Sequence, residues 1–193
     1  MQTYFFLLLA SYLLGSIPSG LILSKILNKG DLRKAGSGNI GATNALRVGG
    51  RLLGVLTLIF DLLKGLVVII LVRFFEQEFI AAYGFVCIIG HIFPIWLNFK
   101  GGKGVATVLG MMLGLNPLVG LLMSIIWIVI FKFFKISSVA SLISLFVSVI
   151  TLIVIDTNYV NSIFLVLILI LIVYKHKDNI IRLYRGEENK ISL

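Results

Sequence analysis

Long apolar stretches, separated by short polar segments, run through most of the chain. Five of them, at residues 4–24, 52–72, 79–99, 139–155 and 163–174, contain few charged side chains. A bilayer core is spanned by roughly 20 apolar residues in a helix. These stretches therefore predict membrane-spanning helices, of which the last is short unless it begins near Tyr159.

Residues 104–134 are also apolar and could form one long helix or a tight hairpin that turns at Asn116-Pro117. Cytoplasmic connections collect Lys and Arg. With the hairpin, fifteen of the 17 Lys and Arg residues fall on one side of the membrane, whereas a single crossing abolishes this asymmetry. We therefore predict an all-α integral membrane protein with seven transmembrane helices, two of them short around Pro117. The N-terminus is expected outside and the C-terminus in the cytoplasm.

Composition agrees with this class. The 193 residues are 59% hydrophobic and only 13% charged, which excludes an ordinary water-soluble domain. We expect one membrane-embedded domain, residues 1–193, whose first span is retained. Asp61 and Lys64 lie three apart on one helix face, and their simplest interpretation is a structural ion pair inside the bundle.

The first unusual cytoplasmic segment, residues 34–47, interleaves glycines with hydroxyl, amide and basic side chains. Its notable residues are Ser37, Gly38, Asn39, Thr43, Asn44 and Arg47. Such a backbone can fold closely around an anion, and an Arg can bind a phosphate through two N–H groups. A flexible linker is the alternative, but linkers are usually more repetitive in Gly and Ser.

The second segment is a glycine turn, Gly101-Gly102-Lys103-Gly104, that opens directly into the next apolar helix. Backbone N–H groups at a helix start, together with a lysine, predict a phosphate site. Because Gly104 stands where a Walker A loop has Ser or Thr, nucleotide hydrolysis is not expected. His91, inside a predicted span, is interpreted as a hydrogen-bonding partner between helices.

The third segment follows the last span. His176 and Asn179 lie three apart and share a face if the helix continues past Tyr174, so they could point toward the other two segments. The neighbouring lysines are explained by topology and attraction to anionic lipid. The short tail beyond Glu188 is not expected to bear on the site.

Several reaction classes lack their motifs. Neither histidine is followed five positions later by a carboxylate, since Trp96 and Ile181 occupy those places, and no Gly-x-Ser-x-Gly elbow or Cys/His metal spacing is present. Covalent catalysis and metal hydrolysis are disfavoured. What remains is a basic, glycine-rich site for phosphate-bearing substrates on the inner side of the membrane. An organic-phosphate transporter and an inactive lipid-binding scaffold are the competing interpretations.

Three strings carry a family resemblance: GSGNIGATNALR (36–47), GHIFPIWLNFKGGKGVAT (90–107) and KHKDNIIRLYRGEE (175–188). They closely resemble the three signature segments of the bacterial acyl-phosphate-dependent glycerol-3-phosphate acyltransferases, the PlsY family. The resemblance extends over essentially the whole chain. It implies transfer of an acyl group from acyl phosphate to the 1-hydroxyl of glycerol 3-phosphate, giving lysophosphatidate and inorganic phosphate in the first acylation step of bacterial phospholipid synthesis.

The resemblance also implies where and with what the enzyme works. It places the enzyme in the bacterial inner membrane with its active site on the cytoplasmic side. It implies no cofactor, no metal and no nucleic acid, and a partner in the soluble enzyme that makes acyl phosphate.

The residues carried over as catalytic are Ser37, Arg47, Lys103, His176 and Asn179, and those shaping the pocket are Gly38, Asn39, Thr43, Asn44, Gly101, Gly102 and Gly104. We expect Arg47 and Lys103 to bind phosphates and the glycine turns to donate N–H groups. Ser37 and Asn179 would orient substrate. The hydroxyl proton would pass either to His176 or to a substrate phosphate.

Overall fold

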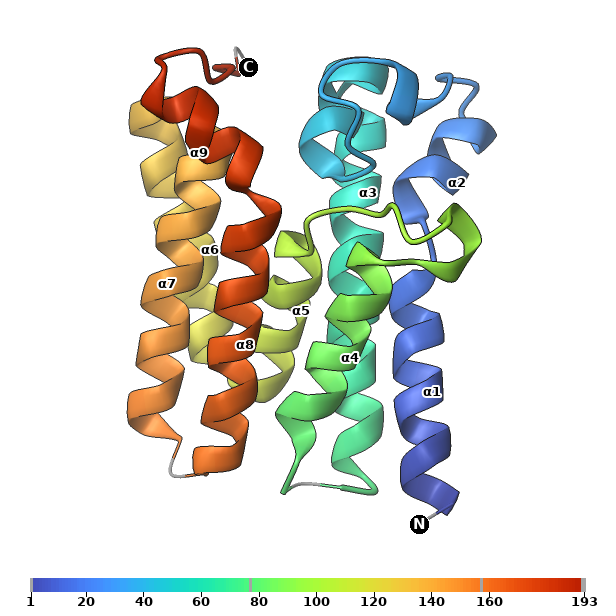
Figure 1. The fold of residues 1–193 in the computed structure, drawn as a ribbon, viewed down its shortest axis with the longest axis vertical. Helices are drawn as coiled ribbons and strands as arrows, with labels where there is room; N and C mark the ends of the chain where they lie inside the picture. Colours follow the sequence, from blue (N-terminus) through green and yellow to red (C-terminus); the bar gives the residue numbers. More distant parts are fainter. Residues whose placement is uncertain (1, 77, 157, 192–193) are drawn as a thin grey trace.

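The computed structural model describes residues 2–76, 78–156 and 158–191, and within them the chain forms nine α-helices and two 3-10 helices. They are α1 (Gln2–Ser16), α2 (Ser19–Ile26), η1 (Leu32–Lys34), α3 (Ala42–Arg73), α4 (Ile80–Ile92), η2 (Ile95–Leu97), α5 (Val105–Leu115), α6 (Pro117–Phe134), α7 (Ser137–Ile155), α8 (Tyr159–Lys175) and α9 (Lys177–Tyr184). The long helices stand side by side as a bundle, with the two chain ends at opposite ends of it (Figure 1).

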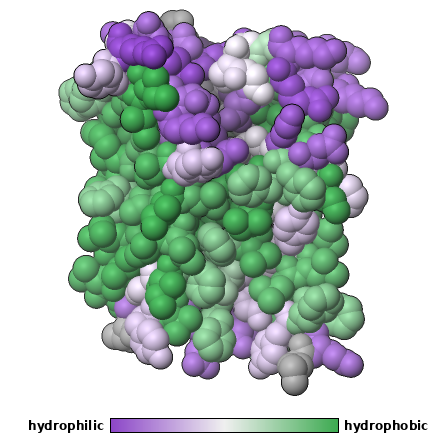
Figure 2. All heavy atoms as spheres, viewed as in Figure 1, coloured by the Kyte–Doolittle hydropathy of each residue, from purple (hydrophilic) through white to green (hydrophobic). Residues whose placement is uncertain are grey.

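A broad apolar band surrounds the middle of the bundle, and hydrophilic residues gather most densely at the end that carries α2 and α9 (Figure 2). We call this end, formed by residues 25–51, 93–104 and 175–191, the basic end. Aromatic and aliphatic side chains of the band are widely exposed, as for Phe60 and Val154 at 50% and 78%. An apolar surface of this extent is favourable in contact with lipid and unfavourable in contact with water. The expectation of an all-α integral membrane protein is therefore confirmed.

The spans differ more in length and straightness than the sequence predicts. Among the described residues four helical stretches are long and apolar enough to cross a membrane, or six if each bent pair, α1 with α2 (43°) and α8 with α9 (56°), counts as one. The remaining apolar helix, α5, has 11 residues. At 1.5 Å per residue it is roughly 16 Å long, about half of a bilayer core.

The predicted hairpin at residue 116 is confirmed, because α5 ends and α6 begins on either side of Asn116. Its carboxamide Oδ1 accepts a hydrogen bond from the N–H of Leu118 at 3.0 Å and thereby caps α6. The last carbonyls of α5 are satisfied from α3, since Arg73 Nη2 donates to the oxygens of Gly114 at 2.7 Å and Leu115 at 3.1 Å. These bonds pair the carbonyls of Gly114 and Leu115, which have no partner within α5.

The short helix is held against α3 by close backbone contact. A Cβ at Gly65 of α3 would lie 2.1 Å from the Thr107 carbonyl oxygen, and a Cβ at Gly110 of α5 would lie 1.9 Å from that of Leu62. Any larger side chain at either position would separate the two helices. Small residues are the usual means by which membrane helices approach this closely, so α5 is fixed in depth and direction.

Two predicted spans lie in stretches long and apolar enough to cross a membrane, but their helices begin or end at other residues than expected. The predicted span 79–99 is helical only to Ile92, followed by the 3-10 turn η2, because Pro94 lacks an N–H and forces Phe93 out of the helical region. The predicted span 52–72 begins ten residues earlier, at Ala42, and is interrupted only at Gly50, whose φ of 83° favours glycine. The second half of the first polar segment is therefore helical and not a loop.

Buried charges join three helical elements beneath the turn that precedes α5. Lys64 Nζ lies 2.8 Å from Asp61 Oδ1, which confirms the predicted ion pair, and it also donates to the carbonyl of Ile17 at 3.2 Å, at the bend between α1 and α2. His91 Nδ1 of α4 lies 3.6 Å from the same carboxylate. All three charged or polar side chains are at most 5% exposed.

Replacing Asp61 with Asn is expected to lower the free energy of unfolding by roughly 3–5 kcal/mol, because the Lys64 ammonium then stays buried without a counter-charge. The measurement is the thermal unfolding midpoint in detergent. The double variant Asp61→Asn, Lys64→Met should recover much of the loss, since no charge remains buried. Equal midpoints for the single variant and the wild type would contradict a paired role.

Candidate active site

The first polar segment is organised around one buried side chain, Asn44 at the start of α3. Its carboxamide nitrogen donates to the carbonyls of Leu32, Ala35 and Asn39 at 2.8–3.1 Å, and its Oδ1 accepts from the N–H of Ser37 at 2.8 Å. Every hydrogen-bonding atom of this carboxamide is therefore engaged within the chain. Asn44, which is 1% exposed, therefore shapes the segment that carries Ser37.

Two more of the predicted pocket residues also serve the segment itself. Asn39 Oδ1 accepts from the N–H of Gly41 at 2.8 Å, which closes a tight turn immediately before α3. The hydroxyl of Thr43 lies 3.0 Å from that of Ser137, at the start of α7. This second contact ties the first segment to the helices on the far side of the site.

The second segment, residues 101–104, lies directly on the end of α4. The N–H groups of Gly101 and Gly102 donate to the carbonyls of Ile92 and His91 at 3.0 and 3.1 Å. A Cβ at Gly102 would lie 2.1 Å from the His91 ring, so only glycine fits. Gly104 is buried with φ of 86°, a conformation that L side chains rarely adopt.

These contacts change the role predicted for the glycines. The N–H groups of Gly38, Gly101 and Gly102 were expected to donate to a phosphate, yet each donates to a carbonyl of the chain, with Gly38 bonded to Ala35 at 3.1 Å. In this structure these three N–H groups are therefore engaged within the chain. Glycine is required there because the backbone must turn or approach its neighbour closely.

The second and third segments meet through Lys103 and Asn179, because Lys103 Nζ donates to Asn179 Oδ1. Burial lowers the pKa of the Lys103 ammonium to about 8. Among its charged neighbours, Glu188 and Asp178 act in the opposite direction, and Arg182 and Arg47 lower the pKa further. A desolvated cation surrounded by hydrogen-bonding groups is suited to bind an anion.

His176 lies at the bend between α8 and α9 and is 3% exposed. Its Nδ1 lies 2.8 Å from the Ile172 carbonyl, which can only accept, so Nδ1 carries the proton and Nε2 is the acceptor. Burial, followed by the positive charge of Lys103, lowers the pKa of His176 to about 4. The imidazole is therefore neutral at physiological pH.

Glu188 is a further candidate site residue, which the sequence interpretation missed. Its carboxylate accepts hydrogen bonds from Asn179 Nδ2 at 2.5 Å, Arg182 Nε at 2.7 Å and Ser138 Oγ at 2.8 Å. Burial alone would raise the pKa of Glu188, but these three hydrogen bonds outweigh it and leave the pKa below its ordinary value. The one sequence signal was an acidic pair in a basic segment, which by itself does not distinguish a buried hub from a solvated charge.

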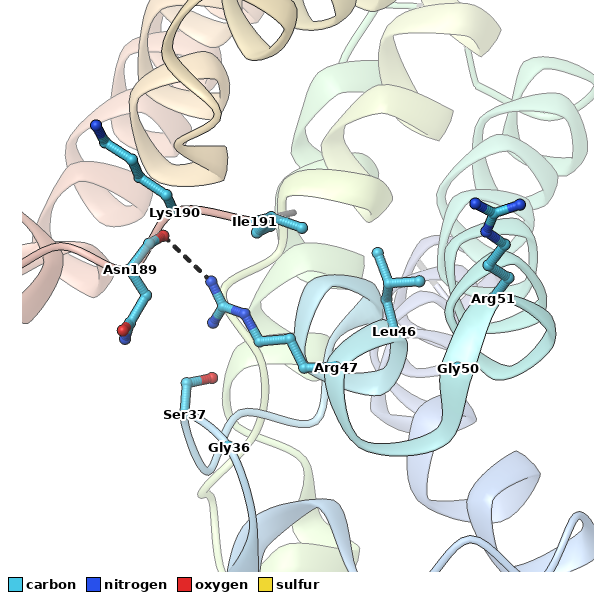
Figure 3. Close-up of a pocket in the computed structure, with 9 residues that line it drawn as sticks. All are labelled: Gly36, Ser37, Leu46, Arg47, Gly50, Arg51, Asn189, Lys190 and Ile191. Atoms are coloured by element: carbon cyan, nitrogen blue, oxygen red, sulfur yellow. Dashed lines mark hydrogen bonds between the residues drawn. The ribbon is translucent and has the colours of Figure 1, made fainter. Parts of the chain in front are cut away.

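A cavity of about 590 Å³ opens at the basic end, between the first segment and the C-terminal tail. Ser37 and Arg47 line one side of it, and Asn189, Lys190 and Ile191 line the other (Figure 3). Arg47 Nη2 donates to the Asn189 carbonyl at 3.4 Å. The tail beyond Glu188, which was not expected to bear on the site, thus lines the same cavity as Ser37 and Arg47.

The structure thus places the five residues predicted as catalytic at one end of the bundle. Ser37 and Arg47 face the cavity, and Lys103 contacts Asn179. The positive charge of Arg47 lowers the pKa of Lys103, and the positive charge of Lys103 lowers the pKa of His176. Fold and geometry together define a multi-pass membrane protein with a candidate anion-binding site at the basic end, where the glycine-rich segments lie. Comparison with known proteins narrows this class.

Residues 5–186 match the family model of the glycerol-3-phosphate acyltransferases. The chain belongs to this family. It is 46% identical to the glycerol-3-phosphate acyltransferase of Pelagibacter ubique (strain HTCC1062) over 190 residues, with 98% of each chain covered. It is 45% identical to that of Ehrlichia canis (strain Jake), with 99% of this chain and 100% of the relative covered.

Solved structures agree. A crystal structure of PlsY (YgiH), an integral membrane glycerol 3-phosphate acyltransferase, in its glycerol 3-phosphate form, superimposes with a TM-score of 0.93 at 36% identity, covering 98% of this chain and 96% of that one. Its lysophosphatidic acid form gives 0.91 at 35% identity with the same coverage. The family resemblance drawn from the three strings is confirmed, and the transporter and scaffold interpretations find no support.

Proposed function

We propose that the chain transfers an acyl group from acyl phosphate to the 1-hydroxyl of sn-glycerol 3-phosphate, giving lysophosphatidate and inorganic phosphate. This would be the first acylation step of bacterial phospholipid synthesis. The observation that carries the proposal is the Lys103–Asn179 contact, because it joins the second and third segments near the charge of Arg47. Family membership supports the acceptor and the product; the acyl donor rests on the resemblance of the three segments.

The proposed roles follow from position and charge. Arg47 and Lys103 bind phosphate groups, and Ser37, at the cavity wall, orients glycerol 3-phosphate. Asn179 accepts a hydrogen bond from the Lys103 ammonium and fixes its direction. Negative charge develops on the carbonyl oxygen and on the departing phosphate in the transition state, and preorganised cations stabilise it.

The reaction needs no covalent enzyme intermediate. The 1-hydroxyl oxygen attacks the acyl carbonyl carbon, the bond from that carbon to the phosphate oxygen breaks, and the phosphate leaves. The hydroxyl proton passes to a substrate phosphate, whose second pKa of about 6 matches neutral pH better than the His176 pKa of about 4. His176 then orients the hydroxyl through Nε2.

We place the basic end in the cytoplasm and count seven spans, with α5 as a short one, in a single domain of residues 1–193. Fifteen of the 17 Lys and Arg residues connect spans on this side under that count, as the positive-inside rule requires. The acyl phosphate would then reach the site from the soluble enzyme that makes it. In this arrangement the membrane is the bacterial inner membrane.

The direct test is purified protein with acyl phosphate and labelled glycerol 3-phosphate, scored for labelled lysophosphatidate and released phosphate. One product of each per turnover is expected. Acyl-CoA in place of acyl phosphate should give no product. Absence of lysophosphatidate with either donor would reject the proposal.

Replacing His176 with Asn tests the proton acceptor. Because His176 is neutral above about pH 4 and serves only to orient, kcat is expected to fall about tenfold while the pH dependence of kcat keeps its shape between pH 5 and 7.5. The measurement is a pH-rate profile of the wild type and the variant. A fall beyond about 10³-fold, together with the loss of an acidic limb near pH 4, would instead identify His176 as the base.

A further inference from the structure

The last described residues fold back over the site instead of extending into solvent. We call residues 188–191 the C-terminal strap. Its first residue, Glu188, is held by α7 and α9 through Ser138 and Arg182, at 2.8 and 2.7 Å. Its last residue, Ile191, donates its N–H to the carbonyl of Lys135, between α6 and α7, at 2.9 Å. The strap is therefore fixed at both ends.

Apolar packing fixes the far end. Ile191 is only 7% exposed and packs in a cluster with Phe131 of α6 and Ala140 of α7, against which Leu46 of α3 also packs. Chain ends usually fray unless something ties them down. A buried isoleucine so near a terminus is such a tie, and Leu46 extends it to the helix that carries Arg47.

Between these anchors the strap forms one wall of the 590 Å³ cavity, opposite Ser37 and Arg47 (Figure 3). The contact across the cavity is the one from Arg47 Nη2 to the Asn189 carbonyl, at 3.4 Å. A backbone carbonyl can hold the guanidinium through one N–H group and leave the remaining N–H groups for a phosphate. The strap thus restrains the exposed Arg47 side chain without neutralising its charge.

We propose that the strap completes the acceptor pocket: Ile191 latches it, the Asn189 carbonyl positions Arg47, and the closed wall keeps water from the acyl phosphate. This inference rests on the proposed function and adds positioning residues to it. The strap lies beyond residues 5–186, which the family model matches. Ile191 and Asn189 act through Arg47 and through exclusion of water, and neither touches the reacting atoms.

The chemistry gives the strap a specific readout. With the strap open, water replaces the 1-hydroxyl: its oxygen attacks the acyl carbonyl carbon, the bond to the phosphate oxygen breaks, and free fatty acid and inorganic phosphate form, with the water proton taken by the phosphate. Phosphate release then exceeds lysophosphatidate formation. Excluding water from a reactive donor is a general use of a closed site.

The test replaces Ile191 with Asp, with Ile191→Val as the conservative variant and Tyr184→Ser as the matched surface control, because Tyr184 is 95% exposed on α9. For Ile191→Asp we expect the KM for glycerol 3-phosphate to rise about tenfold, kcat to change less than about threefold, and the ratio of phosphate to lysophosphatidate to rise several-fold above one. Ile191→Val and Tyr184→Ser should match the wild type.

A chain that ends at Glu188 distinguishes unfolding from opening, because it keeps the side chain of Glu188 and removes the latch. It should reproduce the changed KM and product ratio while staying folded at the assay temperature, as its unfolding midpoint will show. Wild-type KM and a ratio of one in both the truncated chain and Ile191→Asp would overturn the strap. So would an equal defect in Ile191→Val. If the wild type itself forms no lysophosphatidate, the proposed function fails instead, independently of the variants.

Discussion

Replacing Lys103 with Met is expected to lower kcat/KM for acyl transfer about 10³-fold, because one preorganised cation is removed from the charge that develops in the transition state. The ammonium is largely buried and donates to Asn179. Loss of its charge leaves the fold intact, since a methionine fills a similar volume. The measurement is lysophosphatidate formation by purified protein with an unchanged unfolding midpoint.

The matched control is Lys100→Met in the same turn, because Lys100 is exposed to solvent. It should retain wild-type kcat/KM. A similar loss in both variants would mean that general surface charge, and not the buried ammonium, drives the reaction.

The lowered pKa of Lys103 also predicts that kcat/KM falls at alkaline pH. Because burial lowers its pKa to about 8, the charged form is complete well below pH 8 and is lost as the pH rises through that value. The limb should appear in kcat/KM, which reports the free enzyme. It should be absent from Lys103→Arg, whose guanidinium stays charged. The same alkaline limb in both proteins would exclude Lys103 as its source.

Replacing Glu188 with Gln is expected to lower kcat/KM about 10²-fold and also to lower the unfolding midpoint. Three donors, from Asn179, Arg182 and Ser138, converge on the carboxylate. A glutamine offers one acceptor oxygen in place of two and turns an N–H group toward one of these donors. Asn179 then no longer holds Lys103 in one direction.

Glu187→Gln is the matched control, since Glu187 is adjacent and exposed. It should behave as the wild type.

The pKa of Glu188 is lowered, so this carboxylate stays ionised at every pH above the ordinary range of a glutamate. Its hydrogen bonds should therefore be lost only in acid, as the pH falls through that lowered pKa. Activity of Glu188→Gln equal to that of Glu187→Gln would contradict the hub.

Much of the fold could be predicted, because the thickness of a bilayer sets the length of a spanning helix. Residues close together in the sequence also mark where helices end and begin. The turn at Asn116 needed only a side chain that caps a helix and a proline that starts one. The distribution of Lys and Arg then separated the two ends of the bundle. These signals are local or depend only on counting along the chain.

The contacts that the sequence did not reveal have a different origin, since each depends on residues distant in sequence. The N–H groups of Gly101 and Gly102 face carbonyls of α4, and no spacing within their own turn reveals this. Asn44 is indistinguishable by sequence from an amide that binds substrate, yet it holds its own loop together. Glu188 and Ile191 gain their importance only because the tail folds back across the bundle.

The half-length α5 has a consequence for the lipid substrate. Measured from the shared break at Asn116, α6 rises 18 residues and α5 only 11, so the Lys103 turn lies roughly 10 Å deeper than the end of α6. Extracting each methylene from hydrocarbon costs about 0.8 kcal/mol. In the proposed reaction, this recessed floor would let the acyl carbonyl meet the ammonium while most of the acyl chain stays among lipid tails, so the donor would react without being lifted out of its leaflet.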